Sequence, residues 1–130
     1  MNPVYKKDIK SKLILVEDDI NTVSVIKLYI GNKYDIDWVV TGEELLLKSD
    51  ENDYDGFLID IGLPGALNGI ETTKRLKKIA KNKDKPFIAV TAFAMKGDRE
   101  YFLSQGLTHY ISKPFGKQNL LTLLFEALGN

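Results

Sequence analysis

Acidic side chains follow two apolar runs of this sequence in a pattern that suits a metal-assisted reaction. Glu17 and Asp18 come directly after the run 13–16, and Asp60 comes directly after the run 56–59. If these runs are neighbouring strands, each pair of carboxylates repels by about 4 kcal/mol at 4 Å with an effective dielectric of 20. A hard divalent cation relieves that repulsion, and a site with few carboxylates, a main-chain carbonyl and several waters suits Mg²⁺.

A hydroxyl and an ammonium follow two later apolar runs. Thr91 comes after the run 86–90, and Lys113 comes after the run 108–112. If Mg²⁺, Lys113 and Thr91 converge on Asp60, the group that they stabilise is a phosphoryl group in transfer, because that chemistry needs mainly positioning and charge neutralisation. Asp60 would be the nucleophile and would form an aspartyl phosphate. We therefore expect Asp60, Thr91 and Lys113 to be catalytic.

The elements that must position these side chains alternate between two periodicities. Apolar runs predict strands at 13–16, 34–40, 56–60, 86–90 and 108–112. Helical spacing and capping residues predict helices at 20–30, 42–49, 69–81, 95–105 and 118–128, the first three capped by Asp19, Thr41 and Asn68. Five strand-then-helix units predict a parallel sheet with helices on both faces. Ligands of such sheets bind at the carboxyl ends of the strands, where the candidate side chains lie.

The composition favours one globular domain. The chain has 130 residues, of which 44% are hydrophobic and 28% charged. Equal numbers of basic and acidic residues, 18 of each, argue against a general affinity for nucleic acid or for an anionic membrane. The absence of cysteine excludes disulfides and cysteine-ligated metals. No apolar run is long enough to span a bilayer, so we expect a cytoplasmic protein with a flexible tail at 1–10 and one domain at 11–130.

Four segments resemble the receiver domains of two-component response regulators, a family that includes the chemotaxis regulators. They are LILVEDD at 13–19, FLIDIGLPG at 57–65, AVTA at 89–92 and YISKPF at 110–115. The resemblance implies a flavodoxin-like, doubly wound α/β fold with five parallel strands in the order 2-1-3-4-5. It also implies that Asp60 accepts a phosphoryl group from a phosphohistidine of a sensor histidine kinase or a histidine phosphotransfer protein. A downstream protein target would then recognise the switched surface.

The resemblance also implies a metal-ligand set. Asp18 would bind Mg²⁺ directly, Glu17 mainly through water, and Asp60 and the Gly62 carbonyl would complete the protein ligands. The loop after Asp60 departs from the family pattern, because Gly69 follows the loop proline by five residues where four are usual. We therefore expect one extra residue in this loop.

Further roles are implied for the later strand ends. Thr91 and Lys113 would contact the phosphoryl oxygens, and the Lys113-Pro114 bond resembles the cis peptide of the family. Tyr110 resembles the switch aromatic, whose ring turns inward when Thr91 moves toward the phosphoryl group. We expect Phe93, two residues beyond Thr91, to restrict the water that hydrolyses the aspartyl phosphate, and Gly62, two residues beyond Asp60, to leave access open, so that neither fast nor slow loss is favoured.

Two enzyme or cofactor-binding classes remain as alternatives. A phosphatase of the haloacid-dehalogenase type also places an aspartate at a strand end with Mg²⁺, but it needs a second acid where this chain has Gly62. A flavodoxin-type module needs hydroxyls and bare amides after its first strand, where this chain has acids. We expect a signalling module, not a metabolic enzyme, that catalyses only its own phosphorylation and dephosphorylation. It would be a stand-alone regulator or part of a larger response regulator or hybrid histidine kinase.

Some surface residues allow two interpretations. The first and last predicted helices carry wider apolar stripes than one buried face needs, which indicates either an overpacked core or docking surfaces. A kinase or phosphotransfer partner would dock at the first helix, and a homodimer would form through the fourth and fifth. The residues concerned are Val25, Leu28 and Tyr29 in the first helix, and Leu120, Leu121, Leu123, Leu124, Phe125 and Leu128 in the last. A basic cluster is predicted to be a solvated helix face: Lys74, Arg75, Lys77, Lys78, Lys81, Lys83 and Lys85.

Overall fold

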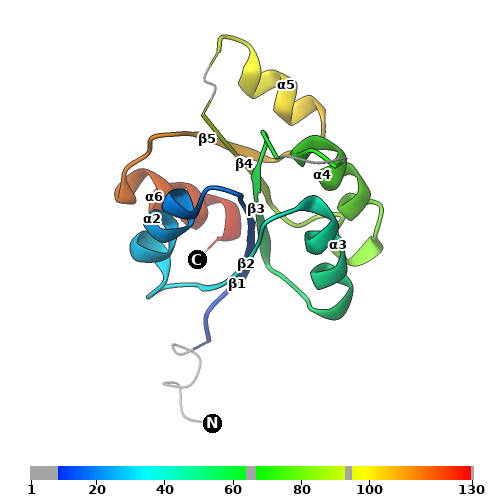
Figure 1. Ribbon diagram of the computed structural model, residues 1–130, viewed down its shortest axis with the longest axis horizontal. Helices are drawn as coiled ribbons and strands as arrows, with labels where there is room; N and C mark the ends of the chain where they lie inside the picture. Colours follow the sequence, from blue (N-terminus) through cyan, green and yellow to red (C-terminus); the bar gives the residue numbers. More distant parts are fainter. Residues whose placement is uncertain (1–8, 64–66, 93–94, 130) are drawn as a thin grey trace.

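The computed structural model describes residues 9–63, 67–92 and 95–129, and its centre is one parallel sheet (Figure 1). The strands are β1 (Lys12–Val16), β2 (Asp35–Val39), β3 (Gly56–Asp60), β4 (Phe87–Thr91) and β5 (His109–Ser112). They lie in the order β2-β1-β3-β4-β5, and every neighbouring pair is parallel. The predicted flavodoxin-like α/β fold and its strand order are therefore confirmed. Only two residues of the predicted tail at 1–10 are described.

The helices cover both faces of the sheet (Figure 1). The elements α2 (Ile20–Ile30) and α6 (Lys117–Leu128) pack on one face. The elements α3 (Gly42–Glu51), α4 (Gly69–Lys77) and α5 (Asp98–Ser104) lie on the other side, and a 3₁₀ turn, η1 (Ala80–Asn82), follows α4. None of the helices in the described part of the chain has the length and apolar character needed to span a bilayer.

Strand β1 shows how the sequence builds two cores. Successive side chains of a strand point to opposite faces. Leu13 and Leu15 therefore join the cluster under α2 and α6, whereas Ile14 and Val16 join the cluster on the other face. All four are fully buried, and each such side chain stabilises the fold by about 1.5–3 kcal/mol relative to exposure. The strand is thus fixed on both sides up to the residue before Glu17.

Helix α4 is shorter than predicted: it ends at Lys77 and not at residue 81. The backbone leaves helical geometry at Ile79, which has φ −81° and ψ 122°. The Asn82 side chain then folds back, and its Nδ2 donates to the Leu76 carbonyl at 3.2 Å. Asparagine side chains compete in this way with continued helix.

Helix α5 also begins later than predicted, at Asp98 and not at residue 95. Gly97 has a φ of 92°, a left-handed conformation that breaks helical geometry and that glycine tolerates. The Met95 amide donates to the Asp98 carboxylate at 2.9 Å, which closes a turn before the helix. The other helix and strand boundaries differ from the prediction by two residues or fewer.

The basic cluster is only partly the solvated face that was predicted. The Lys77 ammonium donates to the Gly106 carbonyl at 2.8 Å. The Lys81 ammonium donates to the Ser49 carbonyl at 2.7 Å and to Asp53 Oδ1 at 3.0 Å, and so ties the end of α3 to η1. The prediction is therefore wrong for the half-buried Lys77, whereas Lys81 is exposed as expected although it also binds the backbone of another element. Lys85 is also half-buried, and the other members that are exposed as expected are Lys74, Arg75, Lys78 and Lys83.

Candidate functional site

Three acids from two neighbouring strands meet at the carboxyl edge of the sheet. Glu17 and Asp18 follow β1, Asp60 ends β3, and β1 pairs with β3 so that the strand ends are level. Each acid offers a carboxylate oxygen, and these atoms all lie within 4.8 Å of one another. Glu17 and Asp60 are buried, whereas Asp18 is exposed. The sequence-predicted acids are therefore brought together.

Lys113 follows the edge strand β5 and reaches this cluster along the carboxyl edge of the sheet. Its Nζ lies 2.6 Å from Glu17 Oε1 and 4.0 Å from Asp60 Oδ2. Its backbone amide donates to the Thr91 carbonyl at 2.7 Å, which continues the pairing of β4 with β5. The bond that follows, Lys113-Pro114, is cis, as the resemblance implies.

The electrostatics of the cluster favour binding of a cation. Burial is the main cause that raises the pKa of Glu17; together with the neighbouring Asp60, and against the lowering effect of Lys113, it brings this pKa to about 7. Three carboxylates share this space with the Lys113 ammonium, so negative charge is in excess. Carboxylate oxygens are the ligands that hard divalent cations prefer. The donor chemistry and the spacing of these acids therefore fit one such ion.

Two glycines, Gly62 and Gly69, lie close to Asp60. The Gly62 amide donates to Asp60 Oδ1 at 3.0 Å, so this oxygen is anchored while Oδ2 faces Lys113. A Cβ on Gly69 would lie 2.5 Å from the Asp60 carbonyl oxygen, which means that only glycine allows α4 to begin against the end of β3. The predicted extra loop residue falls within 64–66, outside the described residues.

Thr91 and Tyr110 lie on the neighbouring strands β4 and β5. Thr91 ends β4 and is buried, with 2% of its surface exposed. Tyr110 is half-buried, and its ring stacks on the Phe102 ring of α5 with centroids 5.7 Å apart. The predicted role of Phe93 concerns a position outside the described residues. The structure brings Thr91 to the same edge as the acids, and the switch role of Tyr110 stays a prediction.

Two side chains hold the turn that carries the acids. Asp19 caps α2, as predicted, because its carboxylate accepts from the Asn21 amide at 3.1 Å and from Thr22 Oγ1 at 2.8 Å. Trp38 of β2 was not predicted to take part. Its indole Nε1 donates to the Glu17 carbonyl at 2.8 Å. The sequence signal for this contact is weak, since it consists only of a tryptophan near the end of a strand.

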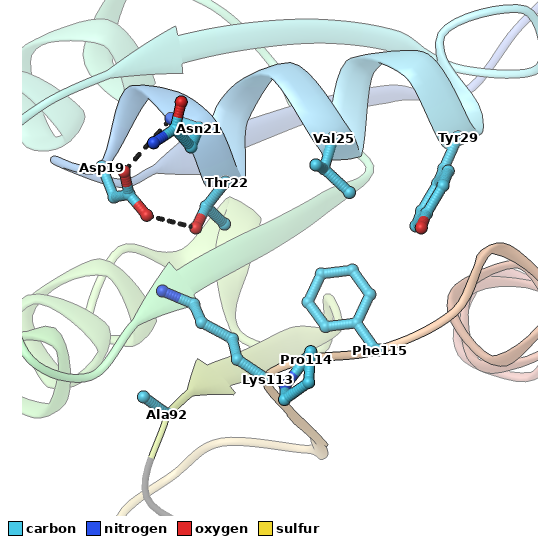
Figure 2. A pocket seen from close by; sticks show the side chains of 9 residues that line it. All are labelled: Asp19, Asn21, Thr22, Val25, Tyr29, Ala92, Lys113, Pro114 and Phe115. Atoms are coloured by element: carbon cyan, nitrogen blue, oxygen red, sulfur yellow. Dashed lines mark hydrogen bonds between the residues drawn. The ribbon is translucent and has the colours of Figure 1, made fainter.

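An open groove of about 490 Å³ adjoins the cluster (Figure 2). Thr22, Val25 and Tyr29 of α2 form one wall, and the chain from Lys113 to Phe115 forms another. Figure 2 shows the Lys113 side chain extending toward the Asp19 end of α2, while the Phe115 ring fills the space below Val25 and Tyr29. The groove is therefore mainly apolar and has the candidate lysine at one end.

Comparisons with known proteins agree with this geometry. Residues 13–125 match the model of the response regulator receiver domain family. The chain is 36% identical over 121 residues to the polar-differentiation response regulator DivK of Brucella ovis. This match covers 93% of this chain and 98% of that protein. It is 34% identical over 128 residues to hybrid signal transduction histidine kinase I of Dictyostelium discoideum, where the match covers 92% of this chain but 7% of the kinase.

A solved structure supports the same relationship. The receiver domain of a sensor histidine kinase from Pseudomonas aeruginosa PAO1, solved with a magnesium ion in its active-site cleft, is 30% identical and has a TM-score of 0.84. The superposition covers 94% of this chain and all of that domain. The family model and the DivK match both extend over almost the whole chain. This chain therefore belongs to the receiver domains of two-component response regulators.

Proposed function

We propose that this receiver accepts a phosphoryl group on Asp60, from a phosphohistidine of a sensor histidine kinase or a histidine phosphotransfer protein. The observation that carries the proposal is the convergence of three acids and Lys113 at one edge of the sheet. The chain would be a signalling module that turns over no metabolite. It would catalyse only the gain and the hydrolytic loss of its own phosphoryl group.

The chemical step is an in-line displacement at phosphorus. An oxygen of Asp60 attacks, the new O–P bond forms, and the N–P bond to the donor histidine breaks. The electron pair of that bond stays on the imidazole nitrogen, which then takes up a proton from solvent. Asp60 reacts as a carboxylate, and the Gly62 amide holds its Oδ1 during the approach of the donor.

Charge neutralisation governs the barrier, because the phosphoryl oxygens bring negative charge to an acidic site. Glu17, Asp18 and Asp60 would hold Mg²⁺ together with the Gly62 carbonyl. When bound, the ion compensates negative charge on the carboxylates and on the phosphoryl group. Lys113 lies 4.0 Å from Asp60 Oδ2, within reach of a phosphoryl oxygen attached there.

Two neighbouring residues would read the phosphorylated state. The Thr91 hydroxyl would donate to a phosphoryl oxygen, since Thr91 ends the strand beside β3. Tyr110 lies on β5 next to β4, and its ring packs against α5. A shift of Thr91 would change the packing available to Tyr110 and so alter the surface of α5 and β5 that a downstream protein target binds.

The groove beside Lys113 supports docking of the phosphoryl donor at α2. Val25 lines the groove and is 38% exposed, and Leu28 on the same helix is 78% exposed. A protein donor that covered these apolar side chains would bring its phosphohistidine close to Lys113 and Asp60. Self-association through α5 and α6 is a second proposal, supported by the exposure of Tyr101 and Phe125.

The decisive experiment measures phosphorylation by intact mass. The protein is incubated with phosphoramidate and MgCl₂, and we expect one added phosphoryl group that disappears in Asp60→Asn. Asp84→Asn is the matched control, because Asp84 is an exposed aspartate outside the site. Equal labelling of the wild type and Asp60→Asn would overturn the assignment of the acceptor.

Docking is tested by comparing a protein donor with a small-molecule donor. We expect Val25→Asp to slow transfer from a phosphorylated histidine phosphotransfer protein while leaving the rate with phosphoramidate unchanged. Leu47→Asp is the control, since Leu47 is equally apolar and 67% exposed but lies on α3. If both variants slow transfer equally, α2 is not the docking helix.

A further inference from the structure

The turn that carries Glu17 and Asp18 is held by the last two residues of β2. The Glu17 amide donates to the Val39 carbonyl at 3.1 Å, which is the final backbone contact between the two strands. The Glu17 carbonyl lies beyond the ladder, and the indole Nε1 of Trp38 donates to it at 2.8 Å. A side chain has therefore taken the place of a ladder partner at the peptide that joins the two acids.

This hydrogen bond fixes more than one oxygen atom. The peptide group between Glu17 and Asp18 is planar, so holding its oxygen sets the orientation of the whole plane and the direction in which Asp18 leaves it. Glu17 has other restraints, because its carboxylate contacts Lys113 and accepts from the Asp19 amide at 3.3 Å. Asp18 is exposed, so its position depends on the backbone more than that of Glu17 does.

The indole is itself held in place before any ligand arrives. Trp38 is half-buried, lies opposite Leu15 in the register of β1 with β2, and packs against the core under α2 and α6. The Lys27 ammonium lies 5.5 Å from the centre of its ring. The indole N–H of Trp38 is thus preorganised, because contacts other than its hydrogen bond to Glu17 hold the ring in place.

We propose that Trp38 is a positioning residue for the divalent-cation site, which it serves by holding the Glu17 carbonyl so that the Asp18 carboxylate stays within the acidic cluster. The inference rests on the proposed function, because it takes the three acids as the ligands of Mg²⁺. Loss of the indole N–H leaves all three carboxylates in the chain but frees the peptide that orients one of them. The affinity for Mg²⁺ then falls while the acceptor chemistry of Asp60 remains.

The test replaces the donor and keeps the ring. Trp38→Phe removes the N–H and retains an aromatic side chain, and replacement of the indole nitrogen by sulfur, with benzothienylalanine at position 38, keeps the shape almost unchanged. Lys27→Met is the matched control, since it removes the ammonium from the ring but keeps the hydrogen bond. Mg²⁺ is titrated into each ¹⁵N-labelled protein, and the amide shifts of Asp18 and Gly62 give the dissociation constant.

We expect Mg²⁺ to bind about three- to tenfold more weakly to both position-38 variants and within twofold of the wild type to Lys27→Met, as loss of one well-placed hydrogen bond predicts. At saturating Mg²⁺ the variants are phosphorylated at close to the wild-type rate. Unchanged Mg²⁺ affinity in the benzothienyl variant would overturn the role of Trp38, even if its stability fell. An absence of Mg²⁺-dependent shifts in the wild type would instead overturn the metal site of the proposed function.

Discussion

The amino and carboxyl edges of the sheet both carry a lysine close to acids, but they differ in how far these side chains are buried. At the carboxyl edge, Lys113 contacts the buried Glu17 and approaches Asp60. At the amino edge, Lys12 lies 3.8 Å from Asp37, and both side chains are well exposed, at 39% and 38%. Both edges thus pair a lysine with acids from neighbouring strands, but only at the carboxyl edge are two of the acids, Glu17 and Asp60, buried.

The partners of the acids explain the difference. At the amino edge the Tyr54 hydroxyl donates to Asp37 Oδ2 at 2.6 Å, and the Lys12 amide donates to Asp55 Oδ2 at 2.7 Å. These carboxylates are solvated or bound by neutral donors, so the edge is stable as it stands. At the carboxyl edge three carboxylates crowd together around one ammonium group. An excess of acids at a partly buried site, and not the mere presence of acids, separates the proposed phosphorylation edge from a structural one.

The sharpest test of this comparison exchanges the lysine at each edge for methionine. We expect Lys113→Met to slow phosphorylation by phosphoramidate by about 100-fold, because one preorganised cationic donor to the phosphoryl oxygens is lost. Lys12→Met should leave that rate unchanged and lower the free energy of unfolding by less than about 1 kcal/mol, as for an exposed ion pair. The rates are measured by intact mass at saturating Mg²⁺. Equal slowing in both variants would break the distinction between the edges.

Two glycines give the next largest contrast: Gly69 of α4, which packs against the end of β3, and Gly56, which begins β3. A Cβ on Gly69 would meet the Asp60 carbonyl oxygen at 2.5 Å, so we expect Gly69→Ala to cost about 2–3 kcal/mol of unfolding free energy. A Cβ on Gly56 would meet only side-chain ends, the nearest being Leu13 at 3.1 Å, and Gly56→Ala should cost less than about 1 kcal/mol. Denaturation in urea measures both. The reverse order would mean that the backbone at Asp60 is not tightly packed.

The pH dependence of stability also distinguishes the two edges, because the group that we expect to titrate near neutral pH, Glu17, lies at the carboxyl edge. Because the pKa of Glu17 rises to about 7 in the folded protein, the folded state binds the extra proton between its ordinary pKa of 4.5 and about 7. The stabilising contribution of the protonated Glu17 carboxyl is fully present below its ordinary pKa and is lost as the pH rises through about 7. In EDTA we therefore expect the melting temperature to fall by a few degrees between about pH 5 and pH 8, and the fall to disappear in Glu17→Gln.

One other group must be controlled in this experiment. Burial lowers the pKa of His109, which contributes stability of the opposite slope, since the unfolded state then binds more protons below the ordinary pKa of 6.5. The comparison is therefore made in a His109→Gln background. Tyr54 at the amino edge has a raised pKa and does not titrate in this range. A slope that persists in Glu17→Gln would contradict the assignment to Glu17.

The smallest effect is expected from the tyrosine of the amino edge. Tyr54→Phe removes the hydrogen bond to Asp37 but keeps the ring in contact with Phe57, with centroids 6.1 Å apart. The unfolding free energy should fall by about 1 kcal/mol, the usual net value of such a bond. The rate of phosphorylation should not change. A measurable change in that rate would show that the amino edge affects the carboxyl edge.

The strands and the acidic cluster could be predicted because parallel topology needs no side-chain detail. Once Glu17 and Asp60 are assigned to the ends of adjacent strands, their proximity follows. The ends of α4 and α5 could not be predicted in the same way, because they depend on a folded-back Asn82 and on the left-handed backbone of Gly97. The contact of Trp38 with the Glu17 carbonyl was missed because an indole near a strand end gives no sign of which carbonyl it will meet.

The length of chain between Glu17 and Lys113, 96 positions, matters for how the domain is made. During synthesis the three acids leave the ribosome well before the only described ammonium that contacts them. A nascent chain that ends before β5 must therefore bring like charges together when β3 aligns with β1, and this repulsion opposes early closure of the sheet. Arrival of the last strand brings Lys113 to the acids, so we expect ordering of the acidic cluster to coincide with completion of the sheet.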